Sequence, residues 1–110
     1  MKIASLFSEK TVFSFEIFPP KKTSSIETIY DTLEALQELQ PDFISVTFGA
    51  GGSGNGENTL AIAKRLKEHY GVLPMAHLPC IHYSKAQIDT ILEQFRENGI
   101  ENILALRGDR

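Results

Sequence analysis

The sequence of 110 residues contains one cysteine, no tryptophan and no long run of apolar or basic residues. A single cysteine can form neither a disulfide nor a cysteine-based zinc site within one chain. The longest apolar runs are far shorter than the roughly 20 residues that cross a bilayer, so we expect no membrane-spanning segment. The net charge is −3 and the longest basic run is Lys21-Lys22, so nucleic acid is not an expected partner.

The amino-terminal segment lacks the features of a secretory signal. Glu9 and Lys10 interrupt its apolar residues, and no small-residue cleavage site follows. We therefore expect a cytoplasmic protein. The remaining composition is that of an ordinary globular chain, with 42% hydrophobic and 23% charged residues. The length suits a single domain over residues 1–110, with no second domain.

Four segments rich in β-branched and aromatic residues alternate with segments of helical periodicity. They start about 30 residues apart, which is the length of one strand, one helix and two loops. Strands that alternate with helices in this way pair in parallel. The expected strands are residues 12–18, 43–48, 73–78 and 102–106.

Three helices are expected between these strands, with ends marked by capping boxes, prolines and glycines. The second of them follows a glycine-rich segment. The residues that mark the ends are Ser24, Glu27 and Pro41 for the first helix, Gly71 for the second, and Ser84, Gln87 and Gly99 for the third.

The two faces of the expected sheet differ in polarity, as strand alternation shows. The apolar face, suited to covering helices, carries Phe13, Phe15, Ile17, Ile44, Val46, Phe48, Ala76, Leu78, Leu104 and Leu106. The small or polar face carries Ser14, Glu16, Ser45, Thr47, Met75, His77, Ala105 and Arg107. An open doubly wound sheet would be apolar on both faces. We therefore expect an α/β fold of the (β/α)8 TIM-barrel type, of which this chain covers about the first four strands and three helices, a half barrel.

Four polar residues of the second face stand at or near the ends of the strands: Glu16, Thr47, His77 and Arg107. Parallel strands in register would bring them to one mouth of the barrel, where barrel enzymes place their chemistry. Glu16 is flanked by apolar residues and followed by the rigid Pro19-Pro20, and an apolar environment favours the protonated form that a general acid needs. An ion pair between Glu16 and Arg107 is the alternative interpretation.

The segment TFGAGGSGNGEN, residues 47–58, matches the spacing of a dinucleotide-binding turn through Gly49, Gly51 and Gly54. A Rossmann fold also needs an acidic residue about 20 positions later, near the end of the next strand, to hold the ribose. This chain has MAHLPC there. A Rossmann module is therefore the least favoured alternative, and we interpret the segment as the second strand-to-helix loop of a barrel.

Four motifs resemble, in order and spacing, those of the methylenetetrahydrofolate reductase family: FSFEIFPPK, FISVTFGAGGS, AHLPC and NILALRGD. The resemblance, to the bacterial type, runs from about residue 12 to the end of the chain. It implies the amino-terminal half of a (β/α)8 barrel that binds FAD noncovalently at the carboxyl ends of its strands. It also implies an enzyme that oxidises NADH or NADPH and passes the hydride to 5,10-methylenetetrahydrofolate, giving 5-methyltetrahydrofolate for methionine synthesis.

The resemblance implies roles for individual residues, matched motif by motif. Glu16 would be the general acid that protonates the folate, and the substrate-binding residues would be Glu16, Thr47 and Asp109. The residues that would bind FAD are Thr47, Phe48, Ala50, His77, Arg107, Gly108 and Asp109. No metal site is expected. Pro79 stands where many members have threonine, which removes a hydroxyl near the flavin-binding histidine.

A half barrel would leave its first and fourth strands with unpaired edges, which favour pairing with another chain. The sequence therefore predicts a homo-oligomer, and the resemblance implies NAD(P)H and methylenetetrahydrofolate as further partners. It also leaves open a second interpretation, in which the chain is a non-catalytic fragment that self-associates through these edges.

Overall fold

The structure, a computed structural model, describes residues 2–19, 26–48, 56–81 and 83–107. Within them, four parallel strands form one sheet in the order β1-β2-β3-β4. Consecutive strands are therefore neighbours, as in a barrel and unlike a doubly wound sheet. The strands are β1 (Ser14–Ile17), β2 (Phe43–Val46), β3 (Leu73–Pro79) and β4 (Ile103–Leu106).

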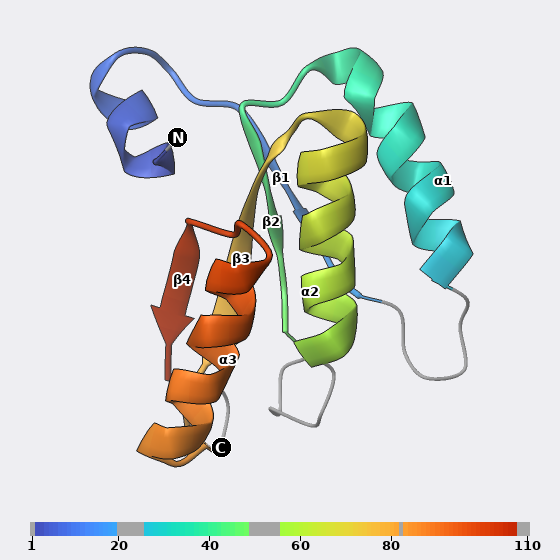
Figure 1. The fold of residues 1–110 in the computed structure, drawn as a ribbon. Coiled ribbons are helices and arrows are strands. Elements are labelled where there is room, and N and C mark those ends of the chain that lie inside the picture. The colour runs from blue at the N-terminus through green and yellow to red at the C-terminus, as the bar shows by residue number, and fades with distance from the viewer. Residues whose placement is uncertain (1, 20–25, 49–55, 82, 108–110) are drawn as a thin grey trace.

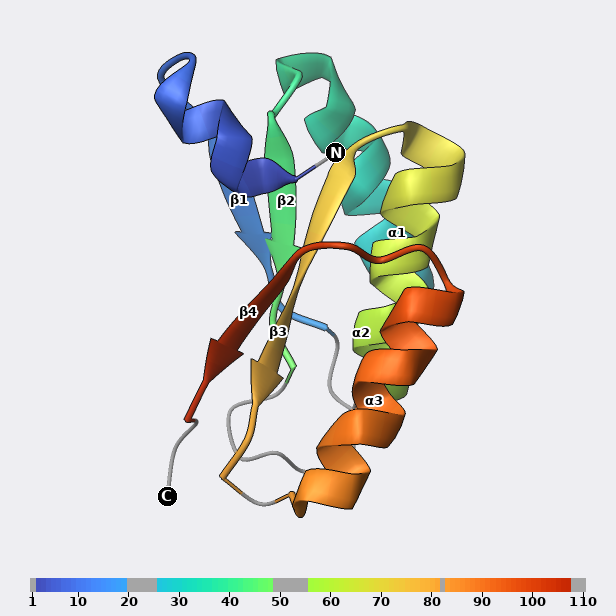
Figure 2. The same cartoon turned by 60° about the vertical axis from the view of Figure 1, so that its left-hand side comes forward.

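Three helices connect the strands and lie together on one face of the sheet, which Figures 1 and 2 show from two directions. They are α1 (Ile26–Leu36), α2 (Gly56–Arg65) and α3 (Lys85–Glu97). Short helical turns, η2 (Gln37–Leu39) and η3 (Leu66–Tyr70), extend α1 and α2. This order of strands and helices confirms the expected half of a (β/α)8 barrel. The sheet face opposite to α1, α2 and α3, which carries Glu16 and His77, is called the helix-free face because no α-helix of the described residues covers it.

The ends of the helices follow the local sequence signals. The Ser84 hydroxyl accepts a hydrogen bond from the amide of Gln87 at 3.2 Å, and the Gln87 side chain accepts one from the Ser84 amide at 2.8 Å. This is the predicted capping box, which satisfies two otherwise unpaired amides. Gly71 follows η3 with a left-handed φ of 67°, a conformation that favours glycine. The predicted cap at Ser24 lies outside the described residues.

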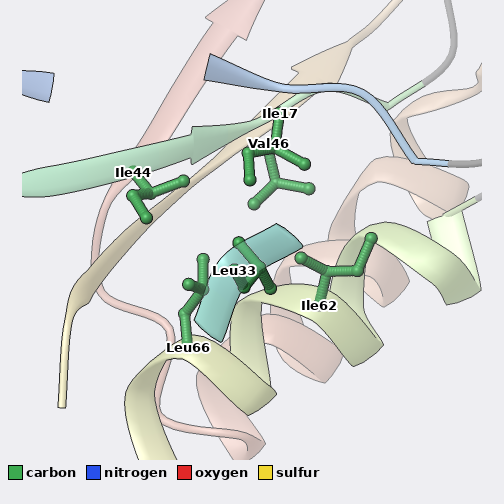
Figure 3. Close-up of a cluster of buried hydrophobic side chains, with 6 residues drawn as sticks. All are labelled: Ile17, Leu33, Ile44, Val46, Ile62 and Leu66. Atoms are coloured by element: carbon green, nitrogen blue, oxygen red, sulfur yellow. The ribbon is translucent and has the colours of Figure 1, made fainter. Parts of the chain in front are cut away.

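The apolar core lies between the sheet and the helices in two clusters. The first joins β1, α1, β2, α2 and η3 through Ile17, Leu33, Ile44, Val46, Ile62 and Leu66 (Figure 3). The second surrounds β3 and α3 and contains Phe48, Ala63, Ala76, Leu78, Phe95 and Ile100. Because α2 contributes to both clusters, it is the central helix of the layer.

The predicted faces are confirmed for the first three strands and wrong for β4. Ile103 pairs in register with Ala76 and packs against the second core cluster, so it is Ile103 that faces the helices. Leu104 pairs with His77, and Leu106 with Pro79. Since neighbouring residues in register share a face, Leu104 lies on the helix-free face beside His77. Both leucines are exposed among the described residues.

Pro74 lies inside β3 without disturbing the sheet. The Ala76 amide donates to the carbonyl of Asn102, just before β4, and the Cys80 amide donates to the carbonyl of Leu106 in β4. By alternation the missing N–H of Pro74 would also point toward β4, but the β3–β4 pairing begins only at Ala76. The proline therefore removes no bond from the ladder.

A 3₁₀ helix that the sequence patterns did not predict, η1 (Ile3–Ser8), lies at the amino ends of the strands. Its Ile3 amide donates to the side-chain oxygen of Asn102 at 2.8 Å, and Phe7 packs edge-on against Phe43. This segment covers the end of the sheet opposite to the predicted mouth.

Candidate active site

Three of the four predicted mouth residues lie on the helix-free face near the carboxyl ends of the strands. Glu16 is on β1, Thr47 directly follows β2, and His77 is on β3. The Thr47 amide donates to the carbonyl of Ile17 at 2.9 Å, which continues the pairing of β1 with β2 by one residue. The parallel sheet thus brings together residues that are about 30 positions apart in the sequence.

Glu16 and His77 meet across β2. The Oε1 atom of Glu16 lies 3.5 Å from the Nε2 atom of His77. The carboxyl side chain is 50% exposed, whereas the imidazole is only 12% exposed. Nε2 is buried and has no hydrogen-bond partner among the described residues. The Glu16 carboxyl is therefore the polar group that can satisfy it.

The electrostatics of this pair favour a neutral histidine. Burial lowers the pKa of His77 below its ordinary value, and the neighbouring Glu16 carboxylate opposes this shift in part. Because burial is the larger effect, the imidazole is uncharged near pH 7. The contact is then between a carboxylate and a neutral imidazole rather than a full ion pair.

The surroundings of Glu16 differ from the sequence-based expectation. The flanking Phe15 and Ile17 pack into or against the core on the helix side, and Phe18 is exposed. Half of the Glu16 side chain is exposed, so these neighbours do not enclose it. Among the described residues, its ion-pair contact is with His77, and the alternative pair with Arg107 is not found.

The positions of Arg107 and Phe48 limit the contacts that each residue can make with a ligand on the helix-free face. Leu104, not Arg107, is the register partner of His77, so the expectation that Arg107 repeats the position of His77 is wrong. Arg107 follows β4, where its carbonyl accepts a bond from the Ile81 amide at 2.9 Å. Phe48 is buried in the second core cluster and packs edge-on against Tyr83. Only the backbone of Phe48 could contact a ligand on the helix-free face.

The sequence patterns did not single out Thr59, which holds the end of β2. Its buried hydroxyl donates to the carbonyl of Thr47 at 2.8 Å, from the first turns of α2. A threonine just before the apolar residues of the expected second helix was the available signal, because the hydroxyl of a helical threonine often bonds a nearby carbonyl. Thr59 therefore positions the backbone of a candidate site residue.

Some predicted residues cannot be placed. Ala50, Gly108 and Asp109 lie outside the described residues. In the described part of the chain, no group of three or more histidine, cysteine, aspartate or glutamate side chains could hold a metal ion. None of its helices is both long and apolar enough to span a membrane.

Comparison with known proteins agrees with the motifs. Residues 2–110 match the family model described as methylenetetrahydrofolate reductase. The chain belongs to the methylenetetrahydrofolate reductase family. It is 43% identical over 109 residues to methylenetetrahydrofolate reductase (NADH) 1 of Arabidopsis thaliana, which covers 98% of this chain and 18% of the relative.

Bacterial members of the family are equally similar. The chain is 43% identical over 96 residues to the 5,10-methylenetetrahydrofolate reductase of Pectobacterium carotovorum, and 40% identical over 96 residues to that of Escherichia coli. Each alignment covers 87% of this chain and 32% of the relative. The chain therefore spans about a third or less of the length of these methylenetetrahydrofolate reductases.

The helix-free face has the chemistry that a flavin of this reductase family would need. An isoalloxazine ring has apolar faces and a polar edge, and such ligands take an apolar platform with a few placed polar groups. Leu104 and Leu106 are exposed near His77, whose imidazole is a polar group on this face. The described residues therefore fit the group.

Proposed function

We propose that this chain forms part of an enzyme that reduces 5,10-methylenetetrahydrofolate to 5-methyltetrahydrofolate with NAD(P)H and FAD. The observation that carries this proposal is the Glu16–His77 pair on the helix-free face near the carboxyl ends of parallel strands. That end of a (β/α)8 barrel is where catalytic residues are placed. Family membership supports the substrate, because the relatives are named methylenetetrahydrofolate reductases.

In this proposal Glu16 is the general acid. Its half-exposed carboxyl can both reach a substrate and carry a proton. His77 and Thr47 would hold the flavin together with Ala50, Arg107, Gly108, Asp109 and the backbone of Phe48. Bound FAD would supply the hydride chemistry, and the protein would orient the reactants. A single cysteine fits a reducing compartment, and we propose the cytoplasm as its location.

A flavin spectrum and an NADH oxidation assay test this function. The full-length protein, extended to the length of its bacterial relatives, is expected to be yellow after purification and to oxidise NADH with menadione as the acceptor. It is then expected to reduce methylenetetrahydrofolate. A colourless protein that remains inactive when FAD is added would contradict the proposal. The same spectrum of the 110-residue chain shows whether this part alone retains the flavin.

A second candidate function is self-association of this chain. Among the described residues, β1 and β4 form the two edges of the sheet, and Leu104 and Leu106 of β4 are exposed. Unpaired edges bind further strands, and a second copy could pair its β1 with β4. Size-exclusion chromatography with light scattering is expected to show a dimer or larger assembly. A monomer at high concentration would exclude it.

A further inference from the structure

The contact between Glu16 and His77 spans a whole strand. β1 and β3 are separated by β2. Their backbones are therefore two strand spacings apart, and each spacing is about 4.8 Å. In register, Glu16 lies beside Ser45, which lies beside Met75. The buried Ser45 has a short side chain, and this leaves room for the longer Glu16 and His77 side chains to meet above β2. A bulky residue at position 45 would stand in the way.

The buried nitrogen needs a partner. A buried polar atom left without a hydrogen bond destabilises the fold, so such atoms are rare unless they serve a purpose. Nε2 of His77 is such an atom, and Oε1 of Glu16 is 3.5 Å from it. This separation is longer than a formed hydrogen bond, but catalytic hydrogen bonds are often long before substrate binds and then shorten.

We propose that His77 is the positioning residue for Glu16, and that Nε2 and Oε1 hold one proton between them across β2. When the carboxylate and the neutral imidazole have taken up this one proton, the first arrangement has the imidazole hydrogen on Nδ1 and the carboxyl group donating to Nε2. Transfer of that proton gives a carboxylate and an imidazolium, so the pair keeps the same total charge and needs no other reactant. The proposal rests on the proposed role of Glu16 as the folate acid.

The contact directs the carboxyl group in either arrangement. A half-exposed glutamate has several rotamers, and a bond to His77 would select the one in which Oε1 faces β3. Within the described part of the chain, the register partner of His77 on β4 is the uncharged Leu104. Of the described residues, Glu16 is the one whose charge acts on His77.

A histidine titration in the 110-residue chain tests the pair without flavin or substrate. The ring resonances of His77 are followed by NMR against pH in the wild type and in Glu16→Gln. The midpoint of His77 is expected to fall by about one pH unit in the variant, because the carboxylate that favours the imidazolium is gone. Glu34→Gln, on the exposed side of α1, is the matched control and is expected to leave the midpoint unchanged.

A control for folding and a result that would contradict the proposal complete the titration experiment. The backbone amide resonances of all variants must keep the dispersion of the wild type, which shows that the fold is intact. An unchanged His77 midpoint in a folded Glu16→Gln variant would overturn the proposal. If that variant does not fold, the titration is repeated in the full-length protein with labelled histidine.

The catalytic consequence is read from the full-length protein. His77→Asn is expected to shift the pH dependence of folate reduction by at least half a pH unit at equal flavin content, whereas the control Glu34→Gln is expected to leave it unchanged. An unchanged pH dependence in His77→Asn would contradict a role through Glu16. If the His77 midpoint falls in Glu16→Gln but the full-length protein does not reduce folate, the proposed function is rejected and the contact between Glu16 and His77 still stands.

Discussion

Replacing Glu16 by glutamine is expected to abolish folate reduction while flavin reduction by NADH continues. Glutamine keeps the size and polarity of the side chain but carries no acidic proton. A general acid contributes about 10²–10⁴-fold to the rate of a step that needs a proton, so folate reduction should fall by at least a hundredfold. Hydride transfer from NADH to the flavin needs no such proton from Glu16.

Stopped-flow measurement of the two half-reactions in the full-length protein separates these effects. Flavin bleaching by NADH reports the first half-reaction, and flavin reoxidation by methylenetetrahydrofolate reports the second. Glu34→Gln serves as the control, since Glu34 is exposed on α1, away from the helix-free face. An equal loss in both half-reactions would show that Glu16 does not act as the folate acid.

Replacing Leu33 by alanine is expected to lower the free energy of unfolding by about 2–5 kcal/mol. Leu33 is 0% exposed and packs in the first core cluster, between the sheet and α2 (Figure 3). Removing its outer carbons leaves a cavity that the neighbouring branched side chains cannot fill without strain. Because a domain of this kind has a total stability of about 5–15 kcal/mol, the variant should be largely unfolded under mild denaturing conditions.

Urea denaturation of the 110-residue chain, followed by circular dichroism, measures this loss. Leu39→Ala is the matched control, because Leu39 is 57% exposed in the turn that follows α1. The same chemical change there should alter the unfolding free energy by no more than about 0.5 kcal/mol. Similar losses at both positions would show that the first cluster is not the stabilising core.

The repeat of strands and helices could be predicted from the sequence because it depends on patterns of neighbouring residues. Apolar runs, capping boxes and glycines each act within a few residues, and the structure reproduces them at Ser84 and Gly71. The direction of the Phe48 side chain was also available from strand alternation. The residue type alone did not show that only the backbone of Phe48 is left to contact a cofactor.

Other features depend on contacts between distant segments. The phase of β4 was wrong because the thirty-residue period treated the last loop as equal in length to the others, whereas Leu104 is the partner of His77. The 3₁₀ helix η1 is held by a bond from Ile3 to Asn102, 99 positions away. The Glu16–His77 contact joins two strands that have β2 between them. No local pattern encodes such a coincidence.

The buried bond from Thr59 to the Thr47 carbonyl has a consequence for how this family could change. It ties the end of β2 to the first turns of α2. Lengthening the chain between two joined points costs little, about 0.6 kcal/mol of closure entropy for each doubling. We therefore expect this bond to keep the Thr47 backbone in place when residues between the two threonines are substituted or added.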